Sequence, residues 1–308
     1  MTSSVRILIP LDGSQLAEHS LAYISALKPL GLSQVEIVSA VEPETVRLRR
    51  GHEDEQRERN LLAAYHRELA EDIRAHTAVD VETKLLSGHA AQAIIEEAEA
   101  FDPDYLIVST HGASGMSRWR FGSVADKVIR GAHCPTLVLG PKSAERDQWL
   151  TERLMPAFKD IVVPLDGSET GEQALPVAQL FAEAFGANIH LVSVVAEDIE
   201  ALLARIGATG GDAPWAGASP ELTESLTKEA KEYIERVSGQ TPGLDKAILA
   251  VRIGDASQAL TDYVTAGEID LVIMASHGRG GLVRAALGST TDRLLGGPAP
   301  VLVVRARA

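Results

Sequence analysis

Three features are scarce in this 308-residue chain: cysteine, long apolar runs and an excess of positive charge. Its single cysteine, Cys134, has no second cysteine with which to form an internal disulfide. No stretch approaches the roughly 18 apolar residues that a membrane-spanning helix needs. The formal net charge of −14 opposes binding to nucleic-acid phosphates and to anionic lipid. We therefore expect a cytoplasmic protein that binds neither nucleic acid nor a membrane.

The composition is otherwise that of an ordinary folded chain. Hydrophobic residues make up 45% of the sequence and charged residues 23%, which argues against disorder. The first residues contain no basic segment followed by a long apolar one, so we expect no signal peptide. A length of 308 residues suits two domains of about 100–200 residues each.

The sequence contains an internal repeat. VRILIPLDGS, which begins at Val5, returns as DIVVPLDGS, and DYLIVSTHG, which begins at Asp104, returns as DLVIMASHG. The first pair is offset by 154 residues and the second by 166, so the second copy carries 12 additional residues. We expect them in 207–220, a Gly- and Pro-rich loop positioned to act as a mobile lid. The domains are placed at 1–143 and 157–308, with a linker over 144–156.

Short apolar runs alternate with helical segments in each copy. Runs without polar–apolar alternation are typical of strands buried on both faces, as in a parallel sheet covered by helices. The predicted fold class is α/β, with two tandem, doubly wound, Rossmann-like domains related by pseudo-twofold symmetry. Strands are expected near 5–10, 34–41, 80–86, 105–109 and 136–140, and near 160–165, 188–195, 247–252, 271–275 and 300–304.

The last strand of each copy is largely apolar. An exposed apolar edge strand invites pairing with another strand. We therefore expect 136–140 and 300–304 to join the two copies as an intramolecular pseudo-dimer, with a homodimer as a further assembly.

Open parallel sheets bind ligands beyond the carboxyl ends of their strands. In this chain, turn-forming and polar residues follow two strands of each copy. A Pro-Leu-Asp-Gly-Ser turn follows the first strand of each copy, and a His-Gly pair follows the fourth. After nine intervening residues comes a Gly-Ser pair that opens a helical segment. Glycine lets a phosphate approach the backbone, and a helix N-terminus offers N–H donors. The pattern predicts a phosphate-binding turn without a Walker lysine.

These motifs resemble those of the universal stress protein family, in its ATP-binding branch. The resemblance rests on G-x-x-G-x(9)-G-[ST], on P-x-D after the first strand and on a closing P-x-L-V-[LV] strand, and it covers nearly the whole chain twice. It implies an ATP pocket in each domain, with Mg²⁺ where the triphosphate requires it. The expected nucleotide contacts are Pro10, Asp12, Ala40, Val108, Ser109, Gly112, Gly115, Gly122, Ser123 and Val124, and in the second copy Pro164, Asp166, Val194, Met274, Ala275, Gly278, Gly281, Gly288, Ser289 and Thr290.

The resemblance also assigns roles within that set. Asp12 and Asp166 would lie at the nucleoside, the penultimate residues of the second strands would touch adenine, and the Gly-Ser turns would hold phosphates. The chain departs from the motif at its first glycine, which is replaced by Ser109 and Ala275. Both substitutes are small, but the loop loses access to positive φ there. The second loop is richer in glycine, so a single occupied site is expected in the second copy.

Several of these residues have a structural alternative. The aspartates could instead cap the next helix as Asx-turn residues. His111 and His277 are interpreted as structural rather than catalytic, and Arg118 and Arg284 either neutralise phosphate or remain solvated. Cys134 is interpreted as a small buried core residue.

Two functions stay open on these observations. The first is an ATP-binding protein of the stress response, with nucleotide in one or both domains as a regulatory ligand and with protein partners that the sequence does not identify. Because no residue set resembles a phosphoryl-transfer site, at most slow hydrolysis is expected. The alternative is an interaction module with vestigial pockets, which the lost glycine favours. An adenylating hydrolase would need a Ser-Gly-Gly loop after the first strand, which is absent.

Overall fold

In a computed structural model the chain forms two compact units, which we describe separately. Unit 1 consists of residues 1–157 and 298–305, and unit 2 of residues 158–297 and 306–308. The structure describes residues 4–41, 52–110, 122–146, 156–196, 220–276 and 288–306. All but the last residue of the expected lid, 207–220, lies outside these ranges.

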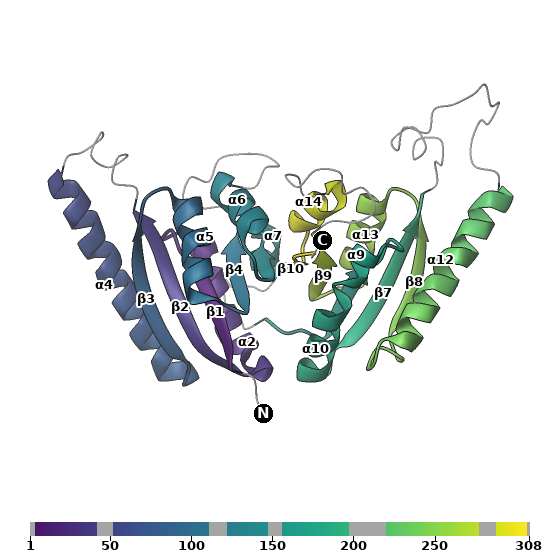
Figure 1. The fold of residues 1–308 in the computed structure, drawn as a ribbon, viewed down its shortest axis with the longest axis horizontal. Coiled ribbons are helices and arrows are strands. Elements are labelled where there is room, and N and C mark those ends of the chain that lie inside the picture. Colours follow the sequence, from purple (N-terminus) through teal and green to yellow (C-terminus); the bar gives the residue numbers. More distant parts are fainter. Residues whose placement is uncertain are drawn as a thin grey trace, which may run out of the picture. The chain divides into compact units, whose positions relative to one another are not determined.

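Unit 1 is a sheet with helices packed against both of its faces (Figure 1). Its strands are β1 (Val5–Pro10), β2 (Leu32–Val41), β3 (Asp80–Ser87), β4 (Tyr105–Ser109), β5 (Thr136–Leu139) and β10 (Val301–Val304). They lie in the order β3-β2-β1-β4-β5-β10, and every strand except β10 is parallel to its neighbours. The helices are α1 (Gln15–Glu18), η1 (His19–Leu21), α2 (Ala22–Ala26), η2 (Lys28–Leu30), α4 (His52–Thr77), α5 (Ala90–Phe101), α6 (Ser123–Gly131) and α7 (Pro141–Arg146).

Alternate residues of the unit 1 strands point to different helices. Ser39 of β2 bonds to His66 of α4, whereas the Arg6 guanidinium of β1 lies 4.2 Å from the ring centroid of Phe101 of α5. Central strand residues such as Ile7 and Leu8 are fully buried. Burial on both faces explains why residues 7–10 of β1 form a continuous apolar run rather than an alternating one.

Unit 2 repeats this arrangement. Its strands are β6 (Asp160–Pro164), β7 (Asn188–Val195), β8 (Ile248–Ile253) and β9 (Leu271–Ala275), all parallel, in the order β9-β6-β7-β8. Its helices are α9 (Glu169–Glu172), α10 (Leu175–Phe185), α12 (Pro220–Gln240), α13 (Ala256–Ala266) and α14 (Ser289–Leu295). The ring centroids of Phe158 and Phe185 lie 4.9 Å apart, and Phe181 joins them in an aromatic cluster.

All ten strands expected from the sequence are present, with ends that differ by at most two residues. The closing strands β5 and β10 pair in antiparallel fashion, with Leu302 opposite Leu137. Both leucines are buried, at 1% and 3% exposure. The apolar edge of β5 is therefore covered by a strand from the far end of the chain.

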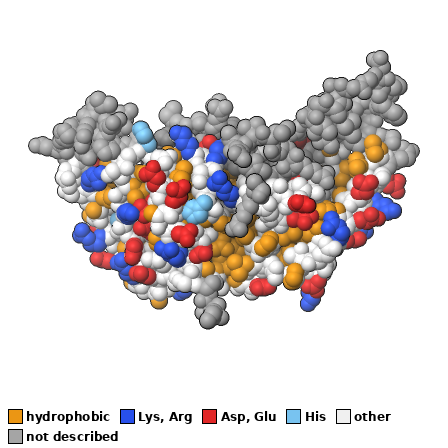
Figure 2. Space-filling model, viewed as in Figure 1, with side chains coloured by type: hydrophobic (Ala, Val, Ile, Leu, Met, Phe, Trp, Pro, Cys, Tyr) orange, Lys and Arg blue, Asp and Glu red, His pale blue; other side chains and the backbone are white. Residues whose placement is uncertain are grey.

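The cysteine, the helices and the surface charges bear on further expectations from the sequence. Cys134 is buried, as expected, and burial raises the pKa of its thiol to about 12. No helix in the described ranges is both long and apolar enough to cross a bilayer. Figure 2 shows acidic and basic side chains interspersed over the face in view.

Candidate functional site

The expected nucleotide contacts that belong to described strands lie at or near the carboxyl ends of those strands. In unit 1, β1 ends at Pro10 and the adjacent β4 ends at Ser109. The chain passes from β1 to β2 on one side and returns to β4 on the other, so strand order reverses between β1 and β4. Pro164 and Ala275 occupy the same positions on β6 and β9 of unit 2. Ligands of open α/β sheets bind beside such a reversal.

The remaining strand residues of the expected set lie just inside this edge. Ala40 and Val194 are the penultimate residues of β2 and β7, and Val108 and Met274 are those of β4 and β9. Val108 and Met274 are buried, at 5% and 8% exposure. Their side chains therefore lie beneath the surface of the candidate site rather than on it.

The turn after β1 is organised by Asp12. Its carboxylate accepts a hydrogen bond from the Ser14 backbone N–H at 3.1 Å, while Gly13 takes the left-handed conformation with φ +78°. The Ser14 hydroxyl in turn accepts from the Ala17 N–H and caps α1. Asp12 thus forms the expected Asx turn, but Ser14 rather than Asp12 caps the helix, and nucleotide contact by Asp12 stays a prediction.

Unit 2 repeats the turn with one difference. Asp166 accepts from the Ser168 N–H at 3.0 Å, and the Ser168 hydroxyl also donates to it at 2.5 Å. A Cβ atom at Gly171 would lie 2.9 Å from the same Asp166 oxygen. Ala17 occupies the matching position in unit 1. The absence of a side chain at Gly171 therefore lets the Asp166 carboxylate fold back over its own helix.

The Gly-Ser turn starts a helix at the same edge. Gly122 is the N-cap of α6, and its N–H donates to the Thr110 carbonyl at 2.7 Å, which ties the start of α6 to the end of β4. Gly288 is likewise the N-cap of α14. Neither helix has a side-chain cap, in contrast to α1 and α9, which serines cap. Among the described residues, no N-cap side chain therefore caps the first-turn N–H donors of α6 and α14.

The space around the two glycines differs. Gly288 has φ −64°, which any residue adopts, and among the described residues a Cβ there would meet only Thr291 Oγ1 at 3.9 Å. A Cβ at Gly122 would lie 3.3 Å from the Thr110 carbonyl oxygen. The fold itself therefore does not require glycine at 288. Its glycine keeps the space in front of the α14 N-terminus open.

Part of the expected site lies outside the described residues. The loops from β4 to α6 and from β9 to α14 fall there. They contain the residues His111, Gly112, Gly115, Arg118, His277, Gly278, Gly281 and Arg284. Their predicted roles stay predictions.

Sequence reasoning missed a tyrosine–glutamate pair beside each aspartate turn. The Tyr65 hydroxyl of α4 donates to Glu18 of α1 at 2.8 Å, and burial, that hydrogen bond and the nearby Asp12 charge raise the tyrosine pKa. In unit 2, burial and the charges of Glu172 and Asp166 raise the pKa of Tyr233, whose hydroxyl is buried without a hydrogen-bonding partner among the described residues. The available signal was the 154-residue offset, which aligns Glu18 with Glu172.

A buried histidine lies beneath the turn in unit 1 alone. The Ser39 hydroxyl donates to the Leu11 carbonyl at 2.7 Å, so its contact with His66 Nε2 at 2.8 Å requires the imidazole to donate. Burial lowers the pKa of His66, which favours this neutral form. Its Nδ1 atom is buried without a hydrogen-bonding partner in the described part of the chain. No sequence signal marked this residue, because Ile234 follows Tyr233 in unit 2.

The aspartates that open the two repeated DYLIVSTHG-type segments have a structural role. Asp104 accepts from the Arg6 backbone N–H at 2.8 Å. Asp270 accepts from the N–H groups of Lys159 and Asp160 at 2.7 and 3.0 Å. Both bind the amino ends of the first strands, opposite the candidate site, so repetition alone does not identify ligand contacts.

Comparison with known proteins places this geometry in a family. The model of the universal stress protein family matches residues 5–140 and again 157–305. A universal stress protein of Mycobacterium tuberculosis is 24% identical over 312 aligned positions, covering 97% of this chain and 96% of that protein. One from Methanocaldococcus jannaschii is 30% identical over 156 positions, covering 48% of this chain and 95% of that protein.

A solved structure shares the fold over the whole chain. The crystal structure of a universal stress protein from Archaeoglobus fulgidus superposes with a TM-score of 0.68 at 19% identity, covering 97% of this chain and 98% of that one. The family model matches twice in tandem, and each match contains one aspartate turn and one Gly-Ser turn. The chain therefore belongs to the universal stress protein family and carries two copies of its domain.

Proposed function

We propose that the protein binds ATP in one or both units as a regulatory ligand. The observation that carries the proposal is the pair of uncapped helices, α6 and α14, that begin with glycine beside the reversal of strand order. A helix N-terminus attracts anions through its N–H donors and its dipole. Such local donors are needed because the protein's net charge of −14 opposes an incoming phosphate.

The residues present at the edge fit an adenine nucleotide. Gly288 leaves open the space in which phosphate oxygens would approach α14, and Ser289 and Thr290 supply hydroxyl groups in its first turn. Asp12 and Asp166 are exposed at the neighbouring turn, where carboxylates suit ribose hydroxyls. Within the described residues no group of three acidic, histidine or cysteine side chains could hold a metal, so Mg²⁺ would arrive with the triphosphate.

Binding, rather than turnover, is the role that these residues support. A phosphoryl-transfer site needs a cation or metal clamp on the transferred group and a residue that orients the nucleophile. The carboxylates of Asp12 and Asp166 already accept backbone N–H groups of their own turns. Burial and neighbouring carboxylates raise the pKa values of the tyrosines beside them, so these tyrosines are poor bases. The nucleotide is then a signal that changes how the protein meets its partners in a stress response.

The alternative, an interaction module with vestigial pockets, is favoured by one observation. Ser109 and Ala275, the last residues of β4 and β9, replace the first motif glycine. Ser109 and Ala275 are extended strand residues, whereas glycine at these positions could adopt positive φ. The loop that follows each strand therefore starts one residue later than the motif glycine would permit.

The two functions are separated by analysing the purified full-length protein. Acid precipitation of one sample releases any bound nucleotide, which is identified by mass spectrometry. A second, native sample is freed of nucleotide by dialysis and titrated with ATP in a calorimeter. We expect released adenine nucleotide and saturable rebinding. No released nucleotide together with no heat of ATP binding would instead support the interaction module.

A further inference from the structure

Unit 1 buries two carboxyl side chains between its sheet and α5. Glu36 of β2 is 5% exposed and Glu97 of α5 is 8% exposed. Glu36 lies on the strand face that carries Arg6 and Gln34, which is the face covered by α5. Two acidic side chains in one interior layer are costly unless a charge or a proton compensates each of them.

One nearby lysine compensates only part of this charge. Lys84 Nζ of β3 lies 2.5 Å from Glu97 Oε2, and its side chain is 51% exposed. Glu36 Oε2 is buried without a hydrogen-bonding partner in the described part of the chain. One half-exposed ammonium group therefore faces two buried carboxyls.

Among the described strand residues, none directly opposite Glu36 is positively charged. On β3, Glu82 lies directly opposite Glu36 and adds negative charge. On β1, the opposite residue is the apolar Leu8. The next residue on that face, Arg6, binds Gln34 at 3.1 Å and lies over the Phe101 ring.

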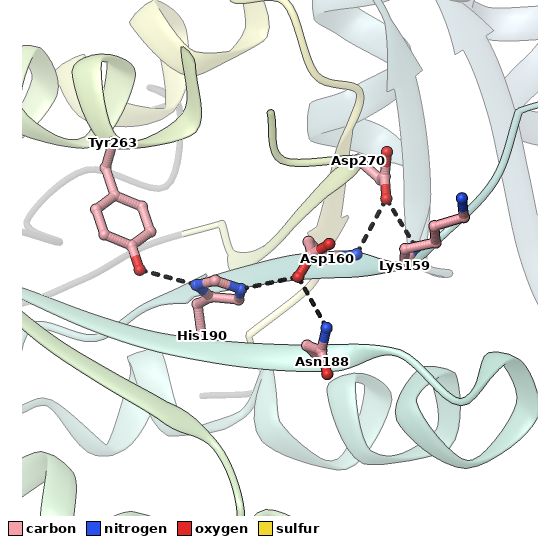
Figure 3. Close-up of polar contacts among 6 residues, drawn as sticks. All are labelled: Lys159, Asp160, Asn188, His190, Tyr263 and Asp270. Atoms are coloured by element: carbon pink, nitrogen blue, oxygen red, sulfur yellow. Dashed lines mark hydrogen bonds and ion pairs between the residues drawn. The ribbon is translucent and has the colours of Figure 1, made fainter. Parts of the chain in front are cut away.

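Unit 2 has different chemistry at the matching positions. His190 of β7 aligns with Glu36 at the 154-residue offset, and Tyr263 of α13 aligns with Glu97 at the 166-residue offset. Figure 3 shows His190 between the Tyr263 hydroxyl, at 2.8 Å, and Asp160, at 3.2 Å. Asn188 also donates to Asp160, at 3.0 Å. The facing acid pair is thus confined to unit 1 within the described residues.

We propose that Glu36 and Glu97 form a proton-binding site in which the two carboxyls hold one proton between them, and that loss of this proton destabilises unit 1. Two facing carboxylates in a buried layer cannot both ionise without strong repulsion, so one keeps its proton while Lys84 balances the other.

The titration of Glu36 fits this arrangement. Burial first, and then the charge of Glu97, raise the pKa of Glu36 from 4.5 to about 7. Because the folded state binds this proton more tightly than the unfolded state, its stabilising contribution is complete below pH 4.5 and is lost as the pH rises through about 7. At tenfold per pKa unit, the opening equilibrium of unit 1 should rise by up to about 300-fold across that interval.

The test uses the full-length protein and two readouts. Infrared spectroscopy at pH 6 should show the carbonyl band of a protonated buried carboxyl, which disappears at alkaline pH. Hydrogen exchange, corrected for intrinsic rates, should show β2 and α5 losing protection as the pH rises from 5 to 9. Peptides of α10 and β9 in unit 2, which contain no histidine, serve as the internal reference.

Glu36→Gln mimics the protonated side chain and should abolish both the band and the pH dependence of protection. Glu82→Gln removes an exposed neighbouring carboxyl and should retain both. The band of the unmodified protein is measured whether or not Glu36→Gln folds. Absence of a protonated-carboxyl band at pH 6, or its full retention in a folded Glu36→Gln variant, would overturn the proposal.

Discussion

Asp12 and Asp166 stabilise the turns in which they lie, whether or not a ligand is bound. Each carboxylate accepts the N–H of a serine two residues on, and that serine caps the following helix. A ligand contact would be an additional use of the same group. The effects of removing an aspartate therefore combine a change in turn stability with a change in ligand affinity.

Replacing Asp166 by alanine should weaken ATP binding in unit 2 without abolishing it. It removes one or two hydrogen bonds, each worth about 0.5–1.5 kcal/mol, or up to about 3 kcal/mol when charge-assisted. At about 1.4 kcal/mol per decade, the expected loss of affinity is roughly tenfold to a hundredfold, measured by calorimetry. Asp245→Ala makes the same charge change at an exposed residue outside the site and should bind like the parent. Equal affinities of the two variants would remove Asp166 from the binding site.

Cys134 should be unreactive in the native protein. Its side chain is buried, and burial raises its pKa to about 12, so almost no thiolate forms at pH 8. A thiol reagent should modify it only as fast as unit 1 opens, and completely in denaturant. Rapid stoichiometric modification of the folded protein would show that the thiol is accessible.

The strands could be predicted well because their signal is local. Apolar runs such as Leu271–Ala275 are buried on both faces, so burial and sequence carry the same information. Contacts between elements that are distant in the sequence produce no local sequence pattern. Tyr65 and Glu18 are 47 residues apart and meet only because α4 packs beside α1. The Glu36–Glu97 pair likewise depends on which face of β2 is covered by α5.

The start of α6 was predictable, but the support at its other end was not. Arg305 donates to the carbonyls of Arg130, Gly131 and Ala132, at 3.3, 3.2 and 2.7 Å. These carbonyls lie at the C-terminal end of α6, where a positive charge is favourable. The helix expected to bind phosphate is thus fixed by a residue after β10.

Arg305→Ala should loosen this end of α6. Loss of the guanidinium should cost unit 1 about 1 kcal/mol, by the usual size of a charge at a helix terminus. Faster hydrogen exchange is expected in 128–132, while α14 in unit 2 should exchange as in the parent. Unchanged exchange in 128–132 would show that the three hydrogen bonds do not contribute in solution.

The chain as a whole uses its duplication to complete unit 1. β10, from the end of the second copy, covers the edge of β5, and both strands are apolar. Edge strands of this kind associate with other chains when uncovered. The duplicated chain therefore covers internally an edge that a single copy would leave open.

Leu302→Asp tests this arrangement. It places a charge at a site that is 1% exposed and opposite Leu137, so separation of β10 from β5 is expected. Hydrogen exchange in 136–139 should rise, and the variant should associate with increasing concentration in sedimentation. Thr261→Asp places the same charge at a partly exposed residue of α13 and is the control. This variant should show the parent's hydrogen-exchange protection in 136–139 and the parent's sedimentation. Unaltered protection of 136–139 would contradict the pairing.

The central claim, that the Gly-Ser turns hold nucleotide phosphates, is tested most directly by calorimetric titration of ATP into a Gly288→Val variant. The fold leaves room for a Cβ at Gly288, so the variant should remain folded while its methyl groups occupy the space of the phosphate oxygens. Gly239→Val, which adds the same side chain at an open position of α12, is the matched control. We predict that Gly288→Val loses ATP binding in unit 2 while Gly239→Val binds as the parent does. Parental affinity and stoichiometry in Gly288→Val would show that the phosphate site is misplaced and would favour the interaction module.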